Sequence, residues 1–222
     1  YVTLSHLTFD DDGAGLDDLI RFRFGHDLAI TNSYLQGYYC NCAQNTDKAI
    51  YGVAVDSNLT IRQNRIQASN EGFILSGNLV NGREESVNFL VEQNLVYGSI
   101  IILEAARPLL RDNIFHGTFS RIQDCGGFDI LRNQFWGGFA LYGSTGDSAS
   151  LFQNNALFHH EPSGASVSWD WALFLNGSSD VDIRHNTLKG AFNAGALGVT
   201  FSSDVRAYNN IFHQSAFNSN TL

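Results

Sequence analysis

Apolar and polar residues alternate in an eight-residue segment that recurs along the whole chain, as in LTIRQNRI (59–66), VDIRHNTL (181–188) and VRAYNNIF (205–212). The first, third and eighth positions are apolar, and the sixth is nearly always Asn. Alternation of period two, with Gly, Asn and Ser between the segments, predicts short β-strands rather than helices. The sixth positions are Ser33, Asn64, Asn94, Asn113, Asn133, Asn155, Asn186 and Asn210, and a degenerate first segment has Leu7 there.

The spacing of these sixth positions indicates a solenoid. From residue 33 onward they are separated by 31, 30, 19, 20, 22, 31 and 24 residues, which is a repeat of about twenty residues with loop insertions. A second apolar run precedes each segment, and a third extended piece usually follows it, as in IFHG and QFWGG. Two or three short strands per turn, stacked about 4.8 Å apart, predict a parallel β-solenoid.

The repeated Asn has a structural explanation in this architecture. It lies where the chain bends between two strands, and Asn tolerates the left-handed conformation and bonds to nearby backbone. Asn side chains stacked along the axis can also bond to each other. The pattern therefore predicts an asparagine ladder that holds the coils together, rather than a catalytic motif.

The eight-residue segments resemble the repeats of right-handed parallel β-helices in the pectate lyase-like superfamily, and they cover essentially the whole chain. The resemblance implies an all-β fold: a single-stranded right-handed parallel β-helix of about eight coils, forming one domain over residues 1–222. That superfamily contains polysaccharide lyases, glycoside hydrolases, uronate epimerases, phage tailspikes and adhesins, and the fold does not choose among them.

Two functional hypotheses follow from this resemblance. The first is an extracellular or cell-surface protein that acts on acidic polysaccharide, as a lyase or a glycoside hydrolase. The alternative is a non-catalytic stalk, adhesin or fibre module that assembles through its faces or ends. The chain shows no cap for its outermost strands, so we expect it to be a segment of a longer protein or to stack on partner chains.

Composition narrows the choice of partners. The chain has 222 residues, a net charge of −9 and only two lysines, Lys48 and Lys189. A nucleic-acid backbone requires clustered cations, so nucleic acid is not expected as a partner. No run of 18 apolar residues is present, so no transmembrane helix is expected. We expect buried or half-buried thiols at Cys40, Cys42 and Cys125.

In enzymes of the family that the chain resembles, the site usually lies along one outward sheet face and its flanking turns. Alternation within the first strand of each coil predicts a mostly apolar outward column, which suggests cover by a loop, a domain or a partner. One step further, at the edge of the strand, the predicted column is polar. The outward column is Arg23, Ala54, Ile74, Ile102, Arg121, Phe174 and Thr200, and the edge column is Asp56, Ser76, Glu104, Asp124, Asn176 and Ser202.

The edge column contains the best candidate for chemistry. Glu104 and Asp124 fall on adjacent coils, where two carboxylates repel unless one is protonated or a cation bridges them. Oxygen ligands on neighbouring coils suggest a Ca²⁺ site, with Arg107 or Arg121 as base or charge clamp for a uronate. In a hydrolase the two acids would serve as general acid and base. The simpler interpretation is a solvated pair balanced by the two arginines.

The insertion at residues 158–174 contains a second candidate site. Trp169 and Trp171 flank Asp170, and aromatic faces bind the apolar faces of sugars, so we expect these residues and His160 to bind substrate. The alternative is a loop that packs its tryptophans on the side of the solenoid. The acidic segment at residues 9–18 lacks the spacing of an EF-hand and is expected to be a solvated turn.

Overall fold

The computed structural model of the chain describes residues 1–10, 18–23, 26–37, 48–55, 58–77, 79–80, 83–84, 88–145, 149–159, 171–190 and 195–214, with side chains except at residues 69, 70, 79, 80, 83, 84 and 214. Some of the sequence predictions concern residues outside these ranges. They are the predictions for most of the acidic segment and for Cys40, Cys42, Asp56, His160, Trp169 and Asp170.

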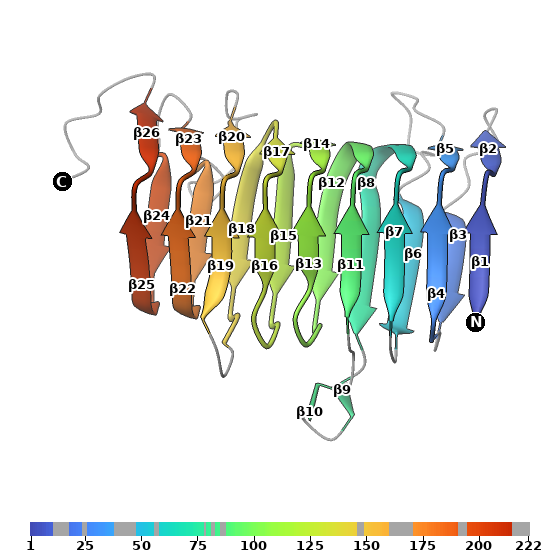
Figure 1. Cartoon of the computed structure of the whole chain (residues 1–222), viewed down its shortest axis with the longest axis horizontal. Helices are drawn as coiled ribbons and strands as arrows, with labels where there is room; N and C mark the ends of the chain where they lie inside the picture. Colours follow the sequence, from blue (N-terminus) through green and yellow to red (C-terminus); the bar gives the residue numbers. More distant parts are fainter. Residues whose placement is uncertain are drawn as a thin grey trace.

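One strand from each repeat joins a nine-stranded parallel sheet that runs along the long axis of the molecule (Figure 1). Equivalent positions of successive repeats are paired in register, so Ile30 pairs with Ile61 and Ile130 with Phe152. The strands, in spatial order, are β1 (Val2–Ser5), β4 (Leu28–Thr31), β7 (Leu59–Arg62), β11 (Phe89–Glu92), β13 (Leu109–Arg111), β16 (Asp129–Leu131), β19 (Ser150–Gln153), β22 (Ser179–Arg184) and β25 (Ser203–Tyr208).

The other strands form a fifteen-stranded parallel sheet with two arms. The strands that directly follow the repeated Asn form the first arm: β2 (Thr8–Asp10), β5 (Tyr34–Gln36), β14 (Ile114–His116), β17 (Gln134–Phe135), β20 (Ala156–Phe158), β23 (Thr187–Gly190) and β26 (Ile211–Gln214). The strands that come next in each repeat form the second arm: β3 (Asp18–Arg23), β6 (Lys48–Val55), β15 (Phe119–Gln123), β18 (Gly138–Tyr142), β21 (Leu173–Asn176) and β24 (Leu197–Thr200). The long strands β8 (Arg65–Gly77) and β12 (Leu95–Leu103) contribute to both arms.

A short antiparallel pair, β9 (Leu79–Val80) with β10 (Arg83–Glu84), is the exception to parallel pairing in the described chain. No α-helix occurs within the described ranges. The all-β arrangement of stacked parallel strands is consistent with a parallel β-helix, as the sequence pattern predicts.

The predicted asparagine ladder is present and buried. The backbone N–H of Ser33 donates to Oδ1 of Asn64 at 2.9 Å, and the same bond joins Asn113 to Asn133 at 3.0 Å and Asn186 to Asn210 at 2.9 Å. The Nδ2 of each ladder Asn also donates to a carbonyl of the preceding repeat. The side-chain oxygen and nitrogen are thus satisfied in the interior, where an unpaired amide would be unfavourable.

Inward residues of all three strand sets stack on their equivalents to form one continuous core. The nine-stranded sheet contributes a column of Ile30, Ile61, Val91, Leu110, Ile130, Phe152 and Ile183, each at most 2% exposed. The first arm contributes Phe115 and Phe135, whose rings stack with centroids 5.0 Å apart. Because every inward side chain packs on the one above and below it, the apolar pattern of the sequence determines which face of each strand is buried.

Replacement of Asn133 by Ala is expected to lower the free energy of unfolding by about 2–4 kcal/mol. The Asn133 side chain accepts from Asn113 and donates to the carbonyls of Leu110 and Leu131, so its loss leaves buried polar groups unpaired. Urea denaturation measures the change, with Gln134→Ala as the control on the exposed neighbour. An equal loss in both variants would contradict a ladder that stabilises the fold.

Candidate functional site

Each pass of the second arm from β12 onward ends in a left-handed bend, and the bend residues stack into a column, here called the bend column. In the first four of these bends the backbone N–H of the bend residue donates to the strand-end carbonyl of the next repeat, at 2.8–3.1 Å. The φ angles lie between 50° and 66°. The bend column comprises Glu104, Asp124, Gly143, Gly177 and Phe201.

The structure brings Glu104 and Asp124 onto adjacent strands of the second arm, as the sequence predicts. The N–H of Glu104 donates to the carbonyl of Gln123 at 3.0 Å, which fixes the two bends in register. The carboxylate of Asp124 is exposed, accepts from Nε2 of Gln123 at 2.9 Å and lies over the backbone of Gly143. Strands of a sheet are about 4.8 Å apart, so two carboxylates border the same edge of the second arm.

Arg121 lies on the outward side of β15, three residues before Asp124, between Ile101 and Ala140 of the neighbouring strands. Its Nε atom is buried and has no hydrogen-bond partner. Burial raises the pKa of Tyr142 above its ordinary value of 10.0, and the positive charge of Arg121 lowers it in part. Arg121 and Tyr142 are therefore close to each other, on neighbouring strands of the second arm.

Arg107 has a different position. Its Nε and Nη2 atoms donate to the two carboxylate oxygens of Asp129 at 2.9 and 3.0 Å, and Nη2 also donates to the carbonyl of Ala149. The hydrogen bonds that Arg107 donates to Asp129 raise the pKa of Arg107. The guanidinium thus links successive repeats on the nine-stranded sheet, whereas Arg121 lies on β15, the strand that ends just before Asp124.

The outward column predicted from the sequence is wrong in part. Ile102 faces the core and is 0% exposed, because register shifts within the pairing of β12 with β8 change which residues face outward. Arg23, Ala54 and Thr200 also lie in other columns. The outward column of the second arm is Arg21, Tyr51, Ile74, Ile101, Arg121, Ala140, Phe174 and Gly198. It remains mostly apolar, and Ala140 and Phe174 are buried.

The predicted edge column also needs correction beyond Asp124. Asn176 pairs with Tyr142 and precedes the bend, whereas Ser202 follows it. Glycines occupy the bend at residues 143 and 177, so no side chain marked these positions in the sequence. Ser76 pairs with Leu103 and likewise precedes the bend.

The residues after the bend form a second internal ladder that the sequence analysis missed. The N–H of Ser178 donates to Oγ of Ser202 at 3.1 Å, and that of Ser144 to Oγ of Ser178 at 3.3 Å. Cys125 has the same role two repeats before Ser178, because its Sγ accepts from the N–H of Ala105 at 3.4 Å. This confirms a buried thiol at Cys125. Two different small side chains share the position, which hides the repeat in the sequence.

Trp171 is the described residue of the insertion candidate. Its half-buried ring lies against the backbone of Gly195 and Gly198, and a Cβ added at Gly198 would be only 2.7 Å from the ring. This is the packing expected if the insertion covers the side of the solenoid.

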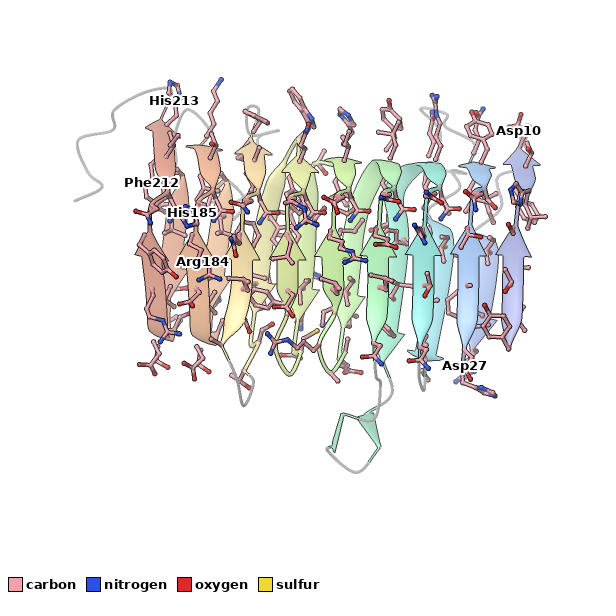
Figure 2. All side chains as sticks on the ribbon, in the orientation of Figure 1. Asp10, Asp27, Arg184, His185, Phe212 and His213 are labelled. Carbon is pink, nitrogen blue, oxygen red and sulfur yellow. The ribbon has the colours of Figure 1, made fainter. Side chains whose placement is uncertain are left out.

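The outward side of the first arm carries a column of side chains that runs from Asp10 to His213 (Figure 2). Its middle part consists of aromatic rings. Tyr97, His116, Trp136 and Phe158 stack in succession, with centroids 4.9, 5.6 and 5.0 Å apart. The faces of these rings therefore cover one another, and Arg65 lies over the outer face of Tyr97. Since sugars stack on open ring faces, we regard this column as a structural stack.

Within the described ranges, no group of three or more His, Cys, Asp or Glu residues is placed to hold a metal ion. Glu104 and Asp124 supply two carboxylates, only part of the six to eight oxygens that Ca²⁺ takes. A cation there would need ligands from substrate and water. No helix of the described chain is long and apolar enough to cross a membrane.

No protein-family model, curated protein or solved structure matches the chain. The case for a function therefore depends on the residues themselves.

Replacement of Arg121 by Met is expected to raise the pKa of Tyr142 further above 10.0, because burial remains while the positive charge is lost. The free energy of unfolding should stay within about 1 kcal/mol of the parent or increase, since a buried donor without a partner is unfavourable. Carbon NMR titration of labelled tyrosines, assigned with Tyr142→Phe, measures the pKa. Arg23→Met, on distant β3, is the control. A lowered pKa would contradict the proximity of Arg121 and Tyr142.

Proposed function

We propose that the protein is a right-handed parallel β-helix of about eight coils, similar in architecture to the pectate lyase-like superfamily, and that it acts on acidic polysaccharide at the cell surface or outside the cell. The asparagine ladder and the stacked parallel strands support the architecture. The right-handedness of the coil and the relationship to that superfamily are inferred from the sequence pattern alone. The proposed activity depends on the outward edge of the second arm.

The observation that carries the proposal is the environment of Arg121. Five guanidinium groups of the nine-stranded sheet and its bends bind acids across successive repeats: Arg62 and Arg111 with Glu92, Arg107 with Asp129, Arg132 with Asp112, and Arg206 with Asp182. Arg184 on the same sheet donates to Gln153 and Tyr208. Arg121 is the contrast, because its Nε is buried without a partner beside Tyr142. Among the described residues no acid pairs with Arg121, and a half-buried guanidinium on the outward side of a sheet favours an external anion as its partner.

Glu104 and Asp124 supply the reactive groups in this proposal. They lie at neighbouring bends of the second arm, after strands that are about 4.8 Å apart. One acid would donate a proton to the leaving glycosidic oxygen while the other takes a proton or attacks the sugar. Arg121 binds the carboxylate of the uronate unit. If Ca²⁺ binds, Glu104 and Asp124 would hold it, and its charge would neutralise the uronate.

A lyase and a hydrolase leave different products, so one assay separates them. The protein is incubated with polygalacturonate and with alginate, with and without Ca²⁺. Absorbance of unsaturated uronate reports elimination, and new reducing ends without that absorbance report hydrolysis. We expect Glu104→Gln and Asp124→Asn each to lower the rate by about 100-fold or more.

Asp204→Asn is the matched control for Asp124→Asn, because Asp204 is an exposed acid with a similar φ of 52° on β25. Its rate should equal that of the parent protein. If the parent protein releases neither product and does not bind either polymer, the proposed activity is wrong.

A structural module is the second candidate function, and one observation favours it. Large apolar side chains are exposed on the described strands at one end of the solenoid, including Ile211 at 65% and Phe212 at 51%. Figure 2 places Phe212 on the outermost strand of the first arm. Such a surface is typical of an interface. A strand edge without a neighbour can also pair with another chain.

If assembly through this end is the function, the parent protein should self-associate at micromolar concentration, and Ile211→Ser combined with Phe212→Ser should abolish the association. Sedimentation velocity over a concentration series measures this. A parent protein that remains monomeric over the series would exclude assembly of copies through this end.

A further inference from the structure

We propose that the bend column continues beyond Asp124 as a binding subsite for uncharged pyranose units, formed by Gly177 and Phe201. This inference rests on the proposed carbohydrate-directed function and specifies the substrate: a polysaccharide in which uncharged units neighbour uronate units. Three features of the column carry it.

The first feature is the bare backbone at Gly177. Its φ of 66° alone does not require glycine, because Glu104, Asp124 and Phe201 adopt φ of 50–54° at equivalent bends. Packing does not require glycine either, since an added Cβ would meet only the backbone of Gly143, at 3.8–3.9 Å. Glycine is also the residue that lets a ligand approach the backbone closely. Gly177 therefore leaves open backbone beside Phe201, whereas the carboxylate of Asp124 covers Gly143.

The second feature is Phe201, which neither conformation nor packing explains. A bulky residue with a φ of 50° is held in an unfavourable region of backbone space. Its side chain is 94% exposed, so it gains almost nothing from burial. The left-handed bend itself recurs in every repeat, but a large apolar residue that is almost fully exposed at such a bend is unusual. An exposed ring at the end of a bare backbone floor has the chemistry to stack on the apolar face of a sugar.

The third feature is the set of polar groups beside the bends. Tyr142, Asn176 and Thr200 are paired in register and immediately precede the three bend residues. Their phenol, amide and hydroxyl groups can donate to and accept from sugar hydroxyls. Three strand spacings separate Asp124 from Phe201, roughly 14 Å, which is room for two pyranose units.

Charge determines which sugar fits. Strands β18, β21 and β24 carry no Lys or Arg, and the chain has a net charge of −9. A uronate placed there would meet the carboxylate of Asp124 without a cation from these strands. A hydroxyl of an uncharged unit can instead donate to Asp124. The uronate carboxylate is then directed toward Arg121, on the same strand as Asp124.

Phe201→Gly separates a binding role from a packing role. Because glycine relieves the strained bend, the thermal midpoint should rise by roughly 2–4 °C. Binding to hyaluronan, in which uronate and uncharged units alternate, should weaken at least tenfold, whereas any binding to polygalacturonate should not change. Isothermal titration calorimetry and thermal unfolding measure the two effects. Asn209→Gly, at an exposed bend of the same repeat with φ of 54°, should also raise the midpoint but leave binding unchanged.

Gly177→Ala is the second variant, because its Cβ fits the fold but projects from the bare backbone. It should weaken hyaluronan binding while the protein remains folded. Unchanged hyaluronan binding in both variants, an equal change for polygalacturonate, or a lower thermal midpoint for Phe201→Gly would overturn the subsite. In those cases binding by the parent protein would leave the proposed function standing. If the parent protein binds no polysaccharide, both proposals are overturned.

Discussion

The structure depends on one buried interaction, the side-chain amide of Asn that joins each repeat to the next. Oδ1 accepts from the preceding ladder residue, and Nδ2 donates to a carbonyl of the preceding repeat. A shift of one residue in any strand would break this set and turn apolar residues toward solvent. Such a shift would leave a buried amide unpaired. The hydrogen bonds of Asn and the burial of apolar side chains therefore specify the register together. That double specification lets loops of different length separate the repeats without disturbing the stack.

The corner after the second arm is less strictly specified. Ser and Cys occupy the second ladder, with bonds of 3.1–3.4 Å, and the preceding bend residues point away from the core. Carboxylates, glycines and a phenylalanine share one backbone conformation there. Since the Asn ladder already fixes the register, side chains at these bends are not needed to hold the fold, and chemistry can vary from repeat to repeat.

This difference explains what could be predicted from the sequence. The Asn ladder and the inward columns were predictable because the same residue type recurs at a constant place in an alternating pattern. The outward side of the second arm was not, because irregular pairing around Tyr97 and Ser99 shifts the alternation, so that Ile101 rather than Ile102 faces outward. Glycine at the bends has no side chain to align. Likewise, the pair between Arg107 and Asp129 joins residues of successive repeats, which a single sequence cannot reveal.

Residues that the fold does not require then distinguish an enzyme from a structural module. A stalk needs only the ladder, the core columns and paired charges such as Glu92 between Arg62 and Arg111. It gains nothing from a buried, unsatisfied Nε on Arg121 or from a strained, exposed ring at Phe201. Both features work against stability, and both lie along the same edge as Glu104 and Asp124. Left-handed bends and buried unsatisfied atoms also occur elsewhere, as at Arg132 and Ser150, so it is the identity of Arg121 and Phe201 at their positions that the proposed ligand would explain.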